Sequence, residues 1–165
     1  MIIFLQNLLR FVILILVQIF ILNNVRFLGY VNPYIYVLFI LLLPFRFPRW
    51  ITLFMAFGTG LLIDIFSNTP GLHAFSTVLI AFLRYPVFNI FTSIEEGANP
   101  TPSFHSFGVV PFISSIALLI LIHHTALFML EVFSFINFGE TIFRILINSL
   151  ITILIILAIQ SFVRK

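Results

Sequence analysis

Ionisable side chains inside otherwise apolar stretches are the residues of this sequence whose types and spacing could do chemistry. Seven of them form three groups: Asp64 with His73, His123 and His124 with Glu131, and Glu140 with Arg144. A carboxylate near an imidazole can move a proton or hold a metal ion, and a carboxylate near a guanidinium forms an ion pair. Proton transfer, metal binding and ion pairing are therefore the chemistries to weigh.

The adjacent histidines, His123 and His124, fall in the middle of an apolar run. Neighbouring side chains point about 100° apart on a helix, so the pair cannot hold one metal ion jointly, and no metal site is expected. Glu131 shares a face with His124 but lies about 10 Å along it, too far for a direct bond. Two interpretations remain: a proton relay, and neutral histidines that donate hydrogen bonds to Ser, Asn or carbonyl groups of adjacent helices. We favour the second.

Asp64 ends a helical stripe of small and polar residues at a spacing of four, which comprises Thr52, Ala56, Gly60 and Asp64. Such a stripe lets another helix approach closely, and Gly58 adds a second permissive site. The SNTPG turn that follows predicts that Asn68 or Thr69 caps the next helix. His73 would then lie beside Asp64 across the turn. We favour a well-capped helical hairpin with one hydrogen-bonded carboxylate over a ligand site.

Glu140 and Arg144 stand four residues apart with the acid nearer the helix N-terminus, the favourable order for an ion pair on one helix. Asn148 and Thr152 continue the same stripe. A helix with this polar face must turn it inward or toward a partner.

The composition determines which elements position these residues. The chain has 165 residues, of which 62% are hydrophobic and 8% are charged. Soluble domains are about 45–50% apolar and about 25% charged, so we expect an all-α integral membrane protein. Residues 1–165 then form a single transmembrane domain with no soluble domain. No basic patch for nucleic acid is present, and no cofactor is expected.

Charges and chain breakers divide the sequence into about six apolar spans, which we place at residues 5–25, 33–45, 50–66, 71–91, 110–134 and 140–162. The second span has 13 residues and is short. It needs a thinned bilayer, an earlier start near Phe27 or partial burial among its neighbours. Residues 92–108, with two prolines and an acidic pair, are expected to form a loop.

A cytoplasmic N-terminus places six basic residues inside, Arg84 among them, and two outside, in agreement with the positive-inside rule. Both termini are then cytoplasmic, and most of the ionisable groups named above face the outer leaflet. The candidate partner-binding or cavity-lining residues are Gly60, Asp64, Gly71, His73, Glu131, Glu140 and Arg144.

Catalytic motifs that membrane enzymes use are missing from the sequence. It has no HExxH zinc motif, no Cys, one Asp and a single Lys at the C-terminus, which excludes a P-loop, a thiolate and an aspartate dyad. We therefore expect no enzyme. Three classes remain: a scaffold for other membrane proteins, a small-molecule-binding subunit of a transporter, and a channel or transporter that acts alone.

The segment GLLIDIFSNTPGLHAFSTVLIAFL, residues 60–83, resembles the signature segment of the bacterial rod shape-determining MreD family. The shared pattern is Gly-Leu-x-x-Asp, a short polar turn, and Gly-Leu-x-Ala before an apolar span. Six residues carry it: Gly60, Asp64, Pro70, Gly71, His73 and Ala74. Chain length, six apolar spans and a basic C-terminal end also fit this family.

The resemblance implies a non-catalytic scaffold in the bacterial inner membrane that helps maintain rod shape and lateral peptidoglycan synthesis. It implies binding to MreC, contact with membrane lipid, and membership of an elongation complex with MreB, RodA and a penicillin-binding transpeptidase.

The MreD family also resembles, in helix arrangement, the S components of energy-coupling factor vitamin transporters. The resemblance therefore implies an S-component-like bundle, and a vitamin-binding S component is the alternative function. S components dock on their transmembrane partner through a small-residue first helix, whereas FVILILVQIFIL at residues 11–22 has no Ala or Gly. An autonomous proton-coupled transporter that uses His123, His124 and Glu131 ranks last.

Overall fold

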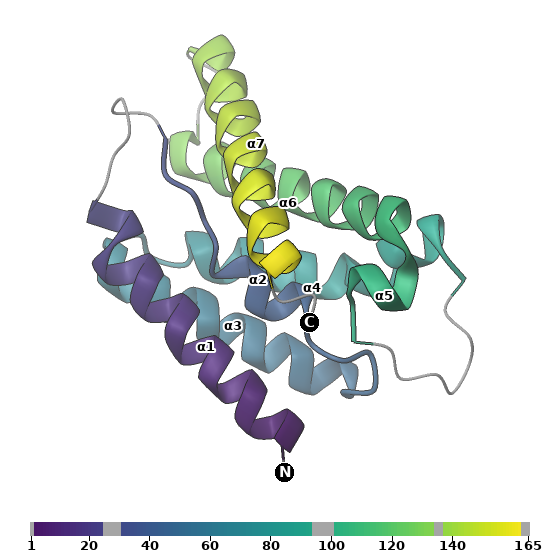
Figure 1. Cartoon of the computed structure of the whole chain (residues 1–165). Helices are drawn as coiled ribbons and strands as arrows, with labels where there is room; N and C mark the ends of the chain where they lie inside the picture. Colours follow the sequence, from purple (N-terminus) through teal and green to yellow (C-terminus); the bar gives the residue numbers. More distant parts are fainter. Residues whose placement is uncertain (1, 25–30, 94–100, 134–136, 163–165) are drawn as a thin grey trace.

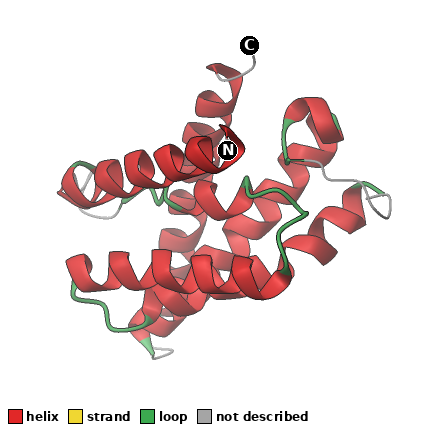
Figure 2. Cartoon of the chain, turned by 90° about the horizontal axis from the view of Figure 1, so that it is seen from below, coloured by secondary structure: helices red, strands yellow, loops and turns green. Residues whose placement is uncertain are grey.

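The computed structural model describes residues 2–24, 31–93, 101–133 and 137–162, and every regular element in these ranges is a helix (Figures 1 and 2). The long helices are α1 (Ile2–Phe20), α3 (Arg49–Ser67), α4 (Leu72–Phe91), α6 (Val109–Val132) and α7 (Phe138–Phe162). The short ones are the 3-10 turn η1 (Leu22–Asn24), α2 (Val37–Leu41) and α5 (Phe104–Phe107).

Five segments are long and apolar enough to cross a membrane: Leu5–Asn24, α3, α4, α6 and α7. The bounds expected from the sequence differ from the observed ones by no more than two residues for these five spans. The all-α class is therefore confirmed, and these five candidate membrane-spanning helices among the described residues indicate a multi-pass membrane protein. In the expected loop at residues 92–108, Phe104–Phe107 form the short helix α5. The acidic pair Glu95 and Glu96 lies outside the described residues.

The second expected span, residues 33–45, does not form a membrane-spanning helix. Only Val37–Leu41 is helical, and the stretch before it, residues 31–36, is non-helical. We call residues 31–44 the core segment, because every side chain from 33 to 44 is buried. Thirteen helical residues rise only about 20 Å, whereas near-extended chain rises about 3.3 Å per residue and covers more depth. Burial among the neighbouring helices, one of the three expected solutions, is the one that the structure adopts.

The core segment runs through the middle of the bundle, antiparallel to α1 (Figure 1). The Pro33 carbonyl meets Gln18 near the end of α1, and the rings of Phe39 and Phe11 lie 5.0 Å apart midway. Phe47, just beyond the segment, lines an apolar surface groove. Asn7, near the start of α1, lines this groove as well. The α3–α4 hairpin, α6 and α7 enclose the remaining sides.

The α3–α4 hairpin is held by the Asp64 carboxylate. Its Oδ1 accepts hydrogen bonds from the backbone N–H of His73 and the hydroxyl of Thr69, and its Oδ2 accepts one from the backbone N–H of Ala74, each at 2.9 Å. A carboxylate in this position satisfies free N–H groups and complements the positive end of the α4 dipole. The expected capped hairpin is present.

The identity of the capping residue differs from the expectation. Asn68 adopts a left-handed conformation at the end of α3, and Thr69 donates to Asp64 instead of accepting from the α4 backbone. Helix α4 begins at Leu72 after Gly71, whose φ of +85° favours glycine. A carboxylate from the preceding helix reaches the α4 N-terminus and makes a local cap unnecessary.

Gly60 lets α3 and α4 approach closely. A Cβ at this position would lie 2.5 Å from the Cα of Ala74 and 2.6 Å from the carbonyl oxygen of His73. Both are backbone atoms, so the helices would have to separate. A Cβ at Gly58 would meet no atom within 4 Å.

We predict that Gly60→Ala lowers the free energy of unfolding by about 1–3 kcal/mol through overpacking. The matched control, Gly58→Ala, should leave stability unchanged or raise it by up to about 1 kcal/mol, because alanine favours helix. Equilibrium unfolding in mixed detergent micelles, followed by circular dichroism, measures both. Equal stability of the two variants would contradict the close approach.

Candidate functional site

The non-helical part of the core segment takes its hydrogen bonds from side chains of α7. The N–H of Asn32 donates to Oδ1 of Asn148 at 2.7 Å, and the N–H of Tyr34 donates to the hydroxyl of Thr152 at 3.1 Å. The two acceptors are four residues apart on a helix, a rise of about 6 Å, which matches two residues of near-extended chain. The polar stripe of α7 therefore serves the backbone of another segment.

Gln18 of α1 performs the same task from the opposite side. Its Nε2 donates to the Pro33 carbonyl at 3.1 Å and to Oδ1 of Asn23 at 2.9 Å, while its Oε1 accepts from the N–H of Tyr36 at 3.4 Å. Gln18 is fully buried. Unsatisfied backbone groups cost several kcal/mol in a bilayer, so non-helical chain survives there only with such partners.

A cluster of tyrosine and histidine side chains lies beneath this backbone. The Tyr36 hydroxyl is 3.0 Å from Nδ1 of His73, 2.8 Å from Nε2 of His123 and 3.3 Å from the hydroxyl of Thr77. The Tyr34 ring packs against His73 and His124, at centroid distances of 5.3 and 5.4 Å. Helices α4 and α6 and the core segment thus converge on two tyrosines.

The hydrogen bonds of His124 assign its tautomer. Its Nδ1 lies 2.8 Å from the Ile120 carbonyl, which only accepts, so Nδ1 carries the proton. Nε2 is then an acceptor for the Thr152 hydroxyl at 3.4 Å. The Thr152 hydroxyl accepts a hydrogen bond from the Tyr34 N–H and donates one to Nε2 of His124. It therefore acts both as an acceptor and as a donor. His124 is hydrogen-bonded, as expected, but the carbonyl that it meets belongs to its own helix, and its contact with an adjacent helix is made through Thr152 of α7.

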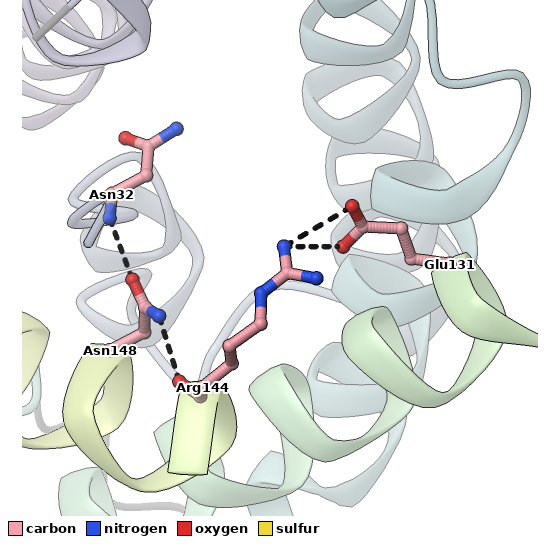
Figure 3. A network of polar contacts seen from close by, with 4 residues as sticks. All are labelled: Asn32, Glu131, Arg144 and Asn148. Atoms are coloured by element: carbon pink, nitrogen blue, oxygen red, sulfur yellow. Dashed lines mark hydrogen bonds and ion pairs between the residues drawn. The ribbon is translucent and has the colours of Figure 1, made fainter. Parts of the chain in front are cut away.

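A polar cavity of about 370 Å³ adjoins the cluster, since Tyr34 and His73 line both. It lies at the end of the bundle where α3 is followed by α4. Its polar lining comes from η1, the core segment, α4, α6, α7 and the α3–α4 turn: Asn23, Asn24, Asn32, Tyr34, Ser67, Thr69, His73, Glu131, Arg144 and Asn148. Nη2 of Arg144 lies 3.3 Å from both carboxylate oxygens of Glu131, and the Arg144 carbonyl accepts from Nδ2 of Asn148 (Figure 3). The Arg144 guanidinium also lies over the Phe128 ring, 4.8 Å from its centroid.

The structure distributes the seven candidate residues over three places. His73, Glu131 and Arg144 line the polar cavity. The remaining four lie elsewhere: Gly60, Asp64 and Gly71 build the adjacent hairpin, and Glu140 is exposed on the first turn of α7.

One sequence-based assignment of charge is corrected. Arg144 pairs with Glu131 of α6, and among the described residues Glu140 has no ion pair, because the side chain of Arg144 turns toward α6. Arg84, one of the six basic residues that the positive-inside count places on the cytoplasmic side, is only 3% exposed and donates from Nη1 to the Ile40 carbonyl at 2.6 Å. His73 meets Asp64 through its backbone N–H, while its ring faces Tyr36.

Sequence reasoning missed the importance of Tyr36, Gln18 and Asn32. The side chain of Tyr36 is fully buried, although the residue lies near one end of the short second span. The available signal was the short second span itself, because a buried non-helical segment requires hydrogen-bonding side chains on the helices around it.

The cavity can bind a small polar molecule through amide, hydroxyl and imidazole groups. Among the described residues, no group of three or more His, Cys, Asp or Glu is placed to hold a metal ion. Comparison with protein-family models, curated proteins and solved structures finds no match to this chain.

We predict that Thr152→Val lowers the free energy of unfolding by about 1–3 kcal/mol, because it leaves the Tyr34 N–H without its acceptor. Thr125→Val is the matched control, since Thr125 is exposed and its hydroxyl bonds only the Leu121 carbonyl of its own helix. The control should change stability by no more than about 0.5 kcal/mol. Unfolding of both variants under the same micelle conditions measures the difference, and equal losses would contradict the role assigned to Thr152.

Proposed function

We propose that this protein is a non-catalytic scaffold of the bacterial cell-wall elongation machinery that binds MreC, as the resemblance of residues 60–83 to the MreD family implies. It lies in the inner membrane with both termini in the cytoplasm. The core segment crosses the membrane between α1 and α3, which brings the number of crossings to six. In this function it works with MreB, RodA and a penicillin-binding transpeptidase and catalyses no reaction.

The observation that supports a scaffold best is an apolar groove between α1 and α3. It has a volume of about 740 Å³, and its floor includes Phe39 and Met55. On its rims, Leu8, Leu61 and Ile65 are exposed. Gly58 lies within the groove with open space above it, and small residues allow the backbone of a second membrane helix to approach closely. We assign this groove to an apolar transmembrane helix of MreC.

We predict that Gly58→Leu blocks the close approach of a second helix within the groove and lowers co-purification of MreC by about tenfold, equivalent to about 1.4 kcal/mol of binding free energy. The fold should tolerate the change, because a Cβ at Gly58 meets no atom within 4 Å. Gly139→Leu on α7 is the matched control, since its Cβ also meets open space but lies outside the groove.

Protein level in the membrane and cell width are measured alongside co-purification. The control should retain MreC within about twofold. MreC recovery that is unchanged in Gly58→Leu at equal protein level would exclude the groove as its docking site.

The polar cavity favours a second candidate, a vitamin-binding S component of an energy-coupling factor transporter. Its volume of about 370 Å³ falls in the range of roughly 300–1,000 Å³ typical of small-molecule sites. Amide, imidazole and guanidinium groups converge on it from η1, the core segment, α4 and α7.

This candidate predicts that the purified protein binds one member of a panel of vitamins in titration calorimetry and co-purifies with ATPases. Arg144→Gln should weaken that binding by about tenfold, and Glu140→Gln, a carboxylate outside the cavity, should leave it within about twofold. Absence of both vitamin binding and ATPases would remove the candidate.

A further inference from the structure

We propose that a basic notch at the other end of the bundle binds the phosphate group of an anionic phospholipid. The notch is a cavity of about 60 Å³ between the start of α3, the end of α4 and the chain that links the core segment to α3. Two of its lining residues are Arg49 and Arg84. It lies at the end of the bundle opposite to the polar cavity, and it is independent of the scaffold function proposed above.

Arg84 carries the argument, because it is a buried charge that lines the notch. It is 3% exposed, and within the part of the chain that the structure describes its one hydrogen bond uses Nη1. The guanidinium has five N–H donors, so most of its capacity remains available. Among the described residues no carboxylate pairs with it. Its planar face covers the Phe45 ring, 4.3 Å from the centroid, which holds the group in place.

A buried cation without a counter-ion is costly in apolar surroundings. An external anion that enters the notch removes this cost. Arginine is suited to the task because its fork of donors matches the oxygens of a phosphate group.

Three further features give the notch affinity for an anion. Arg49 lies on its rim, with the guanidinium 5.8 Å from the centroid of the Tyr85 ring. Helix α3 begins at Arg49 after Pro48, and no side chain caps it, so the first N–H groups of α3 add positive potential there. The described residues that line the notch include no acid.

The notch has room for a polar group larger than one water molecule, because about 10–15 Å³ admits a single water and the notch measures about 60 Å³. A free inorganic phosphate and a lipid headgroup share this chemistry. The apolar surroundings favour the lipid, because Phe82 lines the notch and is also exposed on the outer surface of α4, where an acyl chain would lie.

The end of the bundle that carries the notch is the one with the arginines at the start of α3. Under the proposed orientation it faces the cytoplasmic leaflet, where basic pockets between membrane helices bind anionic headgroups. A phospholipid in the notch would also join α3 and α4 at the end that lacks the Asp64 cap.

The experiment uses the full chain in detergent and measures lipid binding by native mass spectrometry and by the shift in Tm. Phosphatidylglycerol, phosphatidylcholine and inorganic phosphate are added separately. We expect phosphatidylglycerol to bind about tenfold more tightly than phosphatidylcholine and to raise Tm, and inorganic phosphate to have no effect at the same concentration.

Arg84→Gln and Arg49→Gln should each weaken phosphatidylglycerol binding by about tenfold. Arg49 is exposed, so its variant tests the site without disturbing the core. Arg46→Gln is the matched control, because Arg46 is an exposed arginine near the same end that does not line the notch. It should bind within about twofold of the wild type.

Equal binding of the two lipids would overturn the proposal, as would equal losses in Arg49→Gln and Arg46→Gln. A Tm shift with inorganic phosphate but none with phosphatidylglycerol would assign the notch to a free anion and would also overturn it.

Discussion

The need to satisfy the backbone of a buried, non-helical segment governs this structure. Residues 31–36 lie among apolar helices, and from residue 33 onward their side chains are buried, so the N–H and C=O groups of this stretch need partners from the protein. Gln18, Asn148 and Thr152 supply those partners from two helices that are far apart in the sequence. These three polar residues look unfavourable for membrane helices, and this requirement explains why they are there.

The same requirement shapes both ends of the molecule. Where the core segment enters the bundle, its polar partners leave a space lined by Asn32, Arg144 and Glu131, which is the polar cavity. Where the segment leaves, Arg84 donates to the Ile40 carbonyl and closes the last helical turn. At each end, a side chain that is hydrogen-bonded to the core segment also lines a cavity. Asn148 lines the polar cavity, and Arg84 lines the notch.

Local patterns in the sequence predicted the parts of the fold that depend on local contacts. The apolar runs gave the five long spans because hydropathy and length decide them. The spacing of Gly60 and Asp64 predicted the hairpin, since both residues act on the helix that follows directly. The prediction that Thr69 caps α4 was wrong, because the Asp64 carboxylate of the preceding helix accepts hydrogen bonds from the N–H groups at the start of α4.

Long-range contacts were beyond such patterns. Arg144 has Glu140 one turn away, yet it pairs with Glu131 on another helix, and spacing alone cannot show how α6 and α7 pack. Arg84 resembled a topology marker because a lone arginine near the end of a span usually lies at the surface. The site residues that sequence reasoning missed are those whose partners lie on other segments of the chain.

The partners of the core segment also determine when it can settle in the membrane. Asn32 and Tyr34 bond residues 116 and 118 positions later in the chain, which a ribosome synthesises last. Until α7 emerges, the non-helical stretch has no acceptors for these N–H groups within the bilayer. The core segment can therefore reach its final hydrogen-bonded arrangement only after α7 is in place.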